Sequence, residues 1–547
     1  GMGKFSGLRA KVEDLKFIEA LQEEGVLIET TKVEHEYPHC WRCHNPVIFR
    51  ITNQWFFKIE DLKDTILKGD EKVHWVPQRA QQAYRSWIEN LRDNSVSRQR
   101  FWGTPLPIWK CTQCEEIKVL GSREDIEKNG GKVPENLHRP WIDTVELKCK
   151  CKGVMKRTPD IIDVWVDSGT TSWNCLNNDP KLIKEWYPAD AILEAMEQTK
   201  LWFSMLSICS YIYYGNNAFK NVYVYGMLKD IEGKKMSKSL GNIISPYELI
   251  DKHGADVLRY YMCQNNAGKD INFSWDECKN KARNLQILWN IQKLLINLCK
   301  ENKINPYKLR SEVIHNVMNV EEKYIFSKLH NTIKKVTELF DQYRLDEAIQ
   351  PLEDLYLELS RTYIQMVRDK ISLGEDQDKE VCGFTIWKVL LECLKMFSII
   401  SPFISEAIYQ NLREEFKLSE ESILLYSWPE ADKKLINNKL EAQVKEAQNV
   451  IQAALSAREK AGLGLRWPVK EIAIVSKRKE LVDAVEKLRD IIQKQTNAKE
   501  ISVLESLPGI EHSVKCNYGK IGPVYGSLSP QVIAKLTVDS PETILSH

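Results

Sequence analysis

Apolar residues at helical spacing dominate the second half of the chain. Ile325, Leu329, Ile333 and Val336 recur at intervals of three and four residues, which is the spacing of one face of a helix. Such a stripe is more simply explained as helix core than as a binding surface. The pattern predicts a helical bundle over residues 276–435.

A different pattern precedes the bundle, between residues 160 and 275. Strand-like apolar runs cover 161–166 and 222–227, and helical patterns cover 198–213 and 246–253. Alternation of this kind is typical of a parallel, doubly wound sheet. Ligands of such sheets bind beyond the carboxyl ends of the strands. The predicted fold class is therefore α/β plus all-α.

The flanking regions show weaker patterns. Residues 1–33 indicate one amphipathic helix with short flanks, and residues 34–159 mix short apolar runs with Pro, Gly and Cys around a helix over 77–90. Residues 436–547 begin as a helix and continue into a strand-like run at 471–475, which indicates a small α/β region. The predicted domains are 1–33, 34–159, 160–275, 276–435 and 436–547.

Composition is that of a soluble protein with several domains. The 547 residues are 43% hydrophobic and 28% charged, enough to bury sizeable cores. Lys plus Arg (77) nearly equals Asp plus Glu (76), so any RNA-binding surface must be a local patch. No apolar run approaches the roughly 18 residues of a membrane span, and the N-terminus lacks a secretory signal pattern. We expect a cytoplasmic protein with no membrane partner.

Two of the cysteine pairs are spaced like a metal knuckle. The chain has 14 cysteines; Cys111 and Cys114 form a C-x2-C pair, and Cys149 and Cys151 form a C-x-C pair. Four thiolates can complete a tetrahedral structural zinc site, which would fold a knuckle that lacks a large core. Disulfides or free thiols are the alternatives, and a reducing compartment disfavours disulfides.

Cys40 and Cys43 form a further C-x2-C pair without a second pair to complete it. They can be half of a metal site whose other ligands lie elsewhere, or two cysteines packed around Trp41.

Lys235 and Lys238 lie in the stretch KMSKSLGN. Lysine is a compact point charge on a flexible stem, so two of them can follow a triphosphate and stabilise charge that develops in a transition state. Gly233 and Gly241 flank the stretch as hinges. A solvated loop is the alternative, but the strand-like run at 222–227 just before it favours a phosphate site.

The motifs, in their order along the chain, resemble those of class I aminoacyl-tRNA synthetases, and specifically isoleucyl-tRNA synthetases of the archaeal and eukaryotic type. The valyl and leucyl relatives share the lysine stretch. The matching segments are 38–43 (PHCWRC), 97–105 (SRQRFWGTP), 163–169 (DVWVDSG), 194–203, the lysine stretch and 457–469 (AREKAGLGLRWPV).

The resemblance implies the second half of a Rossmann-type catalytic fold, a helical anticodon-binding domain and zinc at the matching cysteines. It implies ATP with magnesium, isoleucine and tRNA as substrates. It assigns Lys238 to ATP phosphate contact, with Lys235 assisting. Two roles are open for Ser237 and Ser239, which can donate to phosphate or shape the loop.

The resemblance also implies an aminoacyl-adenylate site. Glu194 and Gln198 match a Glu-Gly-x-Asp-Gln segment, with Glu194 suited to the ammonium group of the substrate and Gln198 to a ribose hydroxyl. Glu197, at the Asp position of that segment, belongs to the same expected site. Trp202 follows Gln198 at four-residue spacing, and it either lines the pocket or belongs to the core.

Other positions match less well. Asp167 and Ser168, at the matching DSG, are expected to shape the pocket floor. Ala195 and Leu201 replace glycines of the family pattern, Glu197 replaces Asp, and Asn94 stands where a tryptophan usually helps to form the side-chain pocket. Because an apolar pocket distinguishes one methylene by only about 1–3 kcal/mol, losing one wall can change the amino acid selected.

One family signature is absent from the sequence. The family has a His-Ile-Gly-His type tetrapeptide, which this chain does not contain, and the resemblance places it and most of the editing insertion upstream. Residues 1–33 would then be the end of that insertion, and the partners of Cys40 and Cys43 would lie upstream too. We expect the C-terminal part of a synthetase, inactive alone and needing an N-terminal part in cis or in trans. A separately encoded half and a fragment both fit.

Two alternative functions remain. The chain can belong to a ligase for valine or another aliphatic amino acid, or it can be a non-catalytic tRNA-binding or scaffold module. The retention of the lysine stretch, Glu194 and Gln198 argues against the scaffold, because RNA binding needs none of them.

Overall fold

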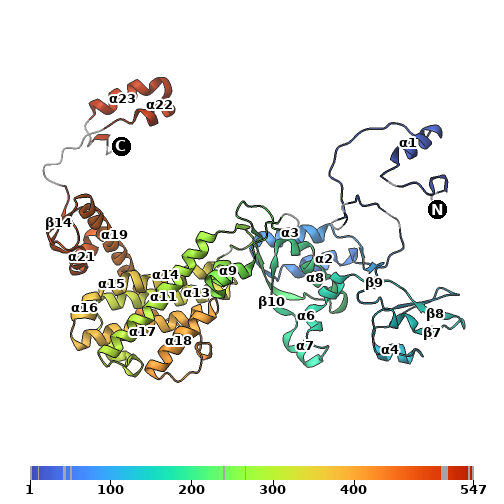
Figure 1. Cartoon of the computed structure of the whole chain (residues 1–547), viewed down its shortest axis with the longest axis horizontal. Coiled ribbons are helices and arrows are strands. Elements are labelled where there is room, and N and C mark those ends of the chain that lie inside the picture. The colour runs from blue at the N-terminus through green and yellow to red at the C-terminus, as the bar shows by residue number, and fades with distance from the viewer. Residues whose placement is uncertain are drawn as a thin grey trace. The chain divides into compact units, whose positions relative to one another are not determined.

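The structure is a computed structural model. It describes residues 3–9, 11–40, 43, 45–49, 52–237, 241–264, 266–506, 515–539 and 543–544. The chain divides into two compact units, of which the first comprises 1–192 and 197–222 and the second comprises 193–196 and 223–547. Figure 1 labels their elements along the chain. In the described ranges no helix combines the length and apolar character needed to cross a membrane.

The first unit is built from short helices and strands. They are α1 (Asp14–Glu23), β1 (Phe56–Phe57), α2 (Lys63–Asp70), β2 (His74–Val76), α3 (Gln78–Glu89), β3 (Asn94–Ser95), β4 (Ser97–Arg98), β5 (Ile108–Cys111), β6 (Ile117–Val119), α4 (Arg123–Lys128), β7 (Glu146–Lys148), β8 (Val154–Arg157), β9 (Ile161–Ile162), α5 (Val164–Gly169), α6 (Thr171–Asn174), α7 (Pro180–Trp186) and α8 (Trp202–Tyr213). β10 (Ala189–Ala195) and β11 (Phe219–Tyr225) form a sheet in the order β10-β11-β2.

Trp75 of β2 lies at the centre of the aromatic core of the first unit. Its ring centroid is 5.1 Å from that of Tyr84 on α3 and 6.0 Å from that of Phe203 on α8, and all three residues are buried. A Cβ at Gly169 would lie 2.6 Å from Met205 Cγ. Because that distance is a clash, α5 can pack against α8 only with glycine at this position.

The predicted cysteine knuckle is a small antiparallel sheet with strand order β6-β5-β8-β7. The Trp109 indole N–H donates to Val145 O at 2.9 Å. The fully buried Arg157 side chain forms an ion pair with Asp143. The hydrophobic core of the knuckle consists of Trp109, Cys111, Leu120, Ile126, Ile142, Val145, Leu147, Cys149 and Met155. Two of the metal-ligand candidates are therefore core residues of the knuckle.

The strand predicted over 161–166 is wrong beyond Ile162. The Asp163 carboxylate accepts a hydrogen bond from the Trp165 backbone N–H at 3.2 Å, so Asp163 is the N-cap of α5. An N-cap aspartate satisfies a backbone donor that a helix start leaves open. The cap therefore outweighs the β-favouring run Val164–Val166. The helix predicted over 77–90 is confirmed as α3.

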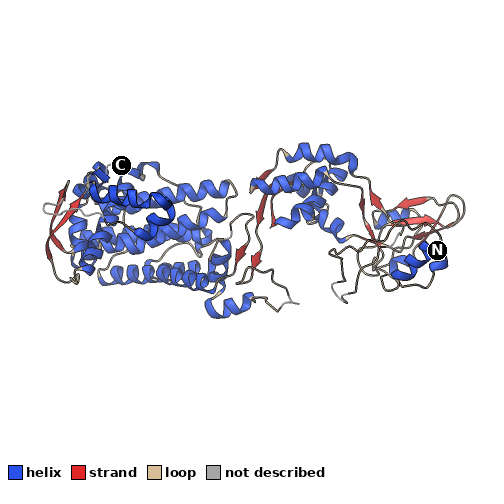
Figure 2. Ribbon diagram, turned by 90° about the horizontal axis from the view of Figure 1, so that it is seen from above, coloured by secondary structure: helices blue, strands red, loops and turns tan. Residues whose placement is uncertain are grey.

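The second unit is mostly helical, as Figure 2 shows. Its helices are α9 (Pro246–His253), α10 (Ala255–Cys263), α11 (Trp275–Glu301), α12 (Ser311–Val317), α13 (Val320–Asp341), α14 (Ile349–Glu358), α15 (Ile364–Met366), α16 (Arg368–Leu373), α17 (Asp376–Phe397), α18 (Pro402–Phe416), α19 (Asn438–Lys460), α20 (Lys479–Lys487), α21 (Arg489–Thr496), α22 (Tyr518–Tyr525) and α23 (Ser529–Val538). Its short strands are β12 (Leu228–Lys229), β13 (Ile271–Asn272), β14 (Val469–Val475) and β15 (Ala498–Leu504).

The predicted helical stripe is the buried face of α13. Ile325, Leu329 and Val336 are fully buried. The helix starts with a capping box, in which the Glu322 carboxylate accepts from the Asn319 N–H at 3.0 Å. Because the cap sets where the helix begins, it also sets which residues face the core.

Other predicted elements occur close to their expected positions. The helix over 246–253 is confirmed as α9, and the strand at 471–475 is part of β14, which pairs in parallel with β15. The strand expected at 222–227 is observed three residues earlier at its start, as β11, and the helix expected from 198 begins at Trp202.

Candidate functional site

The lysine stretch follows β12, and its base is tied to that strand. β12 pairs in parallel with β13, and the backbone of Lys235 forms an antiparallel bridge with Lys229. The Lys235 side chain is exposed, and Ser237 is half-buried. Lys238 and Ser239 lie outside the described residues, so their roles stay predictions.

Two neighbouring lysines are neutralised by carboxylates. Lys234 Nζ lies 2.7 Å from Glu232 Oε2, and Lys229 Nζ lies 2.9 Å from Asp270 Oδ2. Lys235 forms no ion pair with any residue that the structure describes. Its ammonium group is thus the one, among these three lysines, that a phosphate can engage without breaking an ion pair.

Glu194 lies at the carboxyl end of β10 and is held by a tyrosine. The Tyr225 hydroxyl donates to Glu194 Oε2 at 2.8 Å, and the Ala195 backbone N–H donates to the same oxygen at 3.1 Å. Tyr225 is not among the residues that the sequence predicts for the site. The sequence feature that could have indicated Tyr225 is its polar hydroxyl at the end of an apolar strand.

Gln198 caps the helix that follows it. It lies in a turn of 3-10 helix, and its Oε1 accepts from the Trp202 backbone N–H at 3.2 Å. The Trp202 indole N–H donates to Ser168 O at 2.9 Å, and the residue is half-buried. Glu197 is exposed. The four-residue spacing from Gln198 to Trp202 is therefore a capping contact and not two positions on one helix face.

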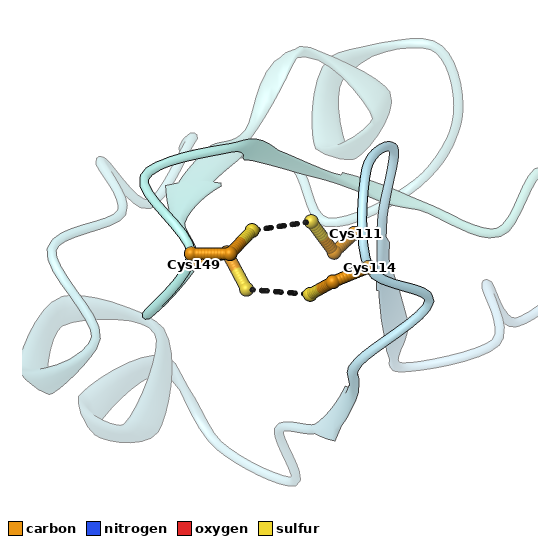
Figure 3. A group of neighbouring side chains, drawn as sticks. Cys111, Cys114 and Cys149 are labelled. Carbon is orange, nitrogen blue, oxygen red and sulfur yellow. Dashed lines mark hydrogen bonds between the residues drawn. The ribbon is translucent and has the colours of Figure 1, made fainter.

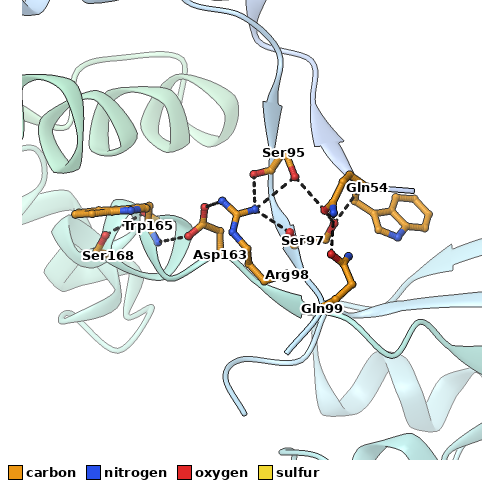
Figure 4. Close-up of polar contacts among 9 residues, drawn as sticks. Gln54, Ser95, Ser97, Arg98, Gln99, Asp163, Trp165 and Ser168 are labelled. Carbon is orange, nitrogen blue, oxygen red and sulfur yellow. Dashed lines mark hydrogen bonds and ion pairs between the residues drawn. The ribbon is translucent and has the colours of Figure 1, made fainter. Parts of the chain in front are cut away.

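Three residues of the motif segments form a polar network around Arg98, which Figure 4 shows. Arg98 forms an ion pair with Asp163. Ser97, which is completely buried, donates to Gln54 Oε1 at 2.7 Å and accepts from the Trp55 N–H at 2.9 Å. The network links β4 to the start of α5. Gln54 and Asp163 are also absent from the predicted site, because their partners are far along the chain.

The remaining predicted positions have separate contacts. Asp167 Oδ2 accepts from the Thr104 hydroxyl at 3.1 Å. Asn94 lies on β3, directly opposite Phe57 of β1 in an antiparallel pair, and it is half-buried.

The four knuckle cysteines converge on one point, as Figure 3 shows for three labelled members. The Sγ atoms of Cys111, Cys114, Cys149 and Cys151 all lie within 4.8 Å of one another. The Cys111–Cys151 and Cys114–Cys149 distances are 3.6 and 3.4 Å. Sulfurs at about 2.3 Å from a tetrahedral zinc ion would be about 3.8 Å apart. The donor set and its spacing fit structural zinc.

The backbone of the knuckle favours a thiolate at Cys111, whereas the pKa values of the Cys114, Cys149 and Cys151 thiols are raised where these sulfurs face one another. The backbone N–H groups of Cys114 and Gln113 lower the pKa of the Cys111 thiol to about 6. A Cβ on Gly153 would lie 3.1 Å from Cys111 Sγ, so glycine leaves room for the sulfur cluster.

The Cys40–Cys43 pair is not joined by further ligands in the described ranges, where the knuckle is the one group of three or more candidate metal ligands. Cys40 is half-buried and Cys43 is exposed. Trp41 lies outside the described residues. The half-site stays a prediction.

Two protein-family models and several known proteins match this chain. Residues 6–274 match the family model "tRNA synthetases class I (I, L, M and V)", and residues 322–475 match "Anticodon-binding domain of tRNA ligase". The chain is 36% identical over 544 residues to the isoleucine–tRNA ligase of Methanocella arvoryzae, covering 98% of this chain and 49% of that protein. It is 37% identical to that of Thermococcus kodakarensis, covering 97% and 52%. The chain thus spans about half the length of the curated relatives it matches.

A solved structure of Mycobacterium tuberculosis methionyl-tRNA synthetase bound by methionyl-adenylate matches with a TM-score of 0.50 and 15% identity, covering 71% of this chain and 69% of that one. At this identity the match concerns the fold alone. The chain therefore combines a class I aminoacyl-tRNA synthetase catalytic fold with a helical anticodon-binding domain, and it is homologous along nearly its whole length to isoleucine–tRNA ligases.

Proposed function

We propose that this chain takes part in the ATP-dependent activation of isoleucine and its transfer to tRNA, as part of an isoleucine–tRNA ligase. The observation that carries the proposal is the 36% identity to isoleucine–tRNA ligases across 98% of the chain. The exposed Lys235, with its two lysine neighbours already paired, supports a phosphate-binding role for the lysine stretch.

The proposed roles follow from charge and hydrogen-bonding capacity. Lys235 and Lys238 contact the phosphates of ATP and its magnesium complex, with Ser237 and Ser239 as further donors. Adenylation needs no protein nucleophile, because it is an in-line displacement helped by positioning and charge stabilisation.

Glu194 offers a carboxylate to the ammonium group of isoleucine. Gln198 uses its oxygen to cap α8, and we assign its amide nitrogen to a ribose hydroxyl of the adenylate. Glu197 and Trp202 are the other two residues that we assign to the aminoacyl-adenylate site. The bundle over residues 276–435 binds the tRNA anticodon region, and zinc at the four knuckle cysteines has a purely structural role.

Activation also requires the tetrapeptide signature that these residues do not contain. We propose that an N-terminal part of the synthetase supplies it, in cis or in trans. The half-length coverage of the relatives supports this.

The test is amino-acid-dependent exchange between ATP and pyrophosphate, across aliphatic amino acids, for this chain alone and mixed with a matching N-terminal part. We expect exchange only in the mixture, with isoleucine preferred. Lys235→Ala should abolish most of it, whereas the matched control Lys234→Ala, at a lysine paired with Glu232, should not.

Other results would redirect the assignment. Preference for valine would connect the Asn94 position to altered selectivity. Absence of exchange in both samples, with tRNA binding intact, would favour the scaffold. Exchange by this chain alone would contradict the need for a second part.

A further inference from the structure

Asn242, the last residue of the lysine stretch, contacts Asp230 in the turn that precedes the stretch. Asn242 Nδ2 donates to Asp230 Oδ2 at 2.7 Å and to Lys235 O at 3.1 Å, and Asn242 Oδ1 accepts from the Ser237 N–H at 2.9 Å. An asparagine amide offers two donor hydrogens and one acceptor oxygen. Two of these three functions therefore hold the backbone on both sides of Met236, and the third binds the Asp230 carboxylate.

Asp230 completes the arrangement from the other end. It is 7% exposed, and its second oxygen, Oδ1, accepts from the backbone N–H groups of Glu232 at 3.0 Å and Lys234 at 2.7 Å. The Asn242 amide and the Lys234 N–H hold the pKa of Asp230 below its usual range. A charged carboxylate thus organises the turn that precedes Lys235, where Gly233 has a left-handed φ of 81°.

These contacts act on the main chain of Lys235 and leave its side chain exposed. The carbonyl of Lys235 is held by Asn242, and its backbone is bridged to Lys229. The other cations of this turn are paired, Lys234 with Glu232 and Lys229 with Asp270. The backbone of Lys235 is therefore constrained, while its ammonium group remains exposed and able to bind an anion.

We propose that Asp230 and Asn242 are positioning residues for polyphosphate binding, which hold Lys235 and the Ser237 backbone in the geometry that engages a pyrophosphate group. This inference rests on the proposed function and names the residues that position Lys235 for it. A pre-set lysine spends less conformational entropy when it binds an anion, so the pair should act on phosphate affinity and not on amino-acid affinity.

The first experiment uses this chain alone and inorganic pyrophosphate as the probe. Acetylation of Lys235 is followed by peptide mass spectrometry at increasing pyrophosphate concentrations, and hydrogen exchange is measured over residues 231–237. Asn242→Ala removes the charge-assisted bond to Asp230 together with the bonds to the Lys235 carbonyl and the Ser237 N–H. It should therefore speed exchange of the Ser237 amide and raise the pyrophosphate concentration that halves labelling by about tenfold. Lys234→Ala, which removes a lysine already paired with Glu232 and keeps the backbone N–H that donates to Asp230, is the matched control and should leave that concentration unchanged.

A swapped pair separates positioning from general damage. Asn242→Asp places two carboxylates in contact and should weaken protection, whereas adding Asp230→Asn restores a donor facing an acceptor and should recover part of it. If pyrophosphate protects Lys235 better in the double variant than in Asn242→Asp alone, the two side chains are directly coupled. Protection equal to wild type in Asn242→Ala, or no recovery in the swapped pair, would overturn the inference.

Exchange kinetics distinguish this inference from the proposed function. In the mixture with an N-terminal part, Asn242→Ala should raise KM for ATP about tenfold and leave KM for isoleucine unchanged. The wild-type mixture could fail to exchange ATP and pyrophosphate with every amino acid tested, while pyrophosphate protection of Lys235 still depends on Asn242. In that case the proposed function fails and the positioning role stands. If wild type exchanges and the ATP KM of the variant is unchanged, only the positioning role fails.

Discussion

Cys151→Ser is the sharpest test of the cysteine knuckle. Cys151 is exposed, whereas Cys111 and Cys149 belong to the small hydrophobic core. Serine at position 151 therefore removes one metal ligand with little loss of packing. Any large effect on the fold of this region must then come from the metal.

The expected magnitude follows from the ligand count. Structural zinc contributes roughly 10–16 kcal/mol to small metal-dependent domains at neutral pH. One of four equivalent thiolates accounts for roughly a quarter of this, about 3 kcal/mol, so zinc affinity should fall about 100-fold. The nine-residue core is too small to hold the knuckle without the ion, since domains of this size commonly depend on a metal or disulfides.

The assay is competition for zinc against a coloured chelator, combined with hydrogen exchange over residues 108–157. Wild type should bind one zinc per knuckle and lose amide protection there when the metal is removed, while α17 stays protected. Cys175→Ser, at an exposed cysteine outside the cluster, is the matched control. Zinc affinity equal in the Cys151 and Cys175 variants, or protection of the knuckle without metal, would refute the reasoning.

Two further predictions concern single hydrogen bonds. Tyr225→Phe removes the donor at 2.8 Å from Glu194, so KM for the amino acid should rise about tenfold, from a loss of about 1.5 kcal/mol; Tyr223→Phe is the strand control, and an equal effect in both variants would contradict the role. His330 Nδ1 accepts from the Asp432 N–H at 3.0 Å, and burial lowers the His330 pKa below 6.5. Its contribution to stability is full above pH 6.5 and is lost as the pH falls through the lower folded pKa, so urea unfolding at two pH values should show a steeper loss in wild type than in His330→Gln.

Local signals in the sequence predict much of the architecture. The stripe on α13, the helix α9 and the strand within β14 follow from periodicity and from start and stop residues. The cysteine pairs predict the knuckle, because C-x2-C and C-x-C spacings present two sulfurs from one turn. Such features depend on residues close together in the chain.

The misread elements share one cause. Asp163 and Gln198 each use a side-chain oxygen to cap the next helix, so α5 replaces the end of a predicted strand and α8 starts later than expected. An apolar run such as Val164–Val166 is compatible with a strand or a helix. A single capping hydrogen bond decides between them, and propensity alone does not reveal it.

By itself, the sequence determined the helical bundle, the paired cysteines, the lysine stretch and the order of motifs shared with the ligase relatives, because periodicity and motif spacing are properties of neighbouring residues. Only the tertiary structure decided which polar groups meet. Tyr225 and Glu194 are 31 positions apart, Asn242 and Asp230 are 12 apart, and Arg98 and Asp163 are 65 apart. Hydrogen bonds form over about 3 Å and in narrow directions, so these partners are set by the packing of whole elements and not by spacing along the chain.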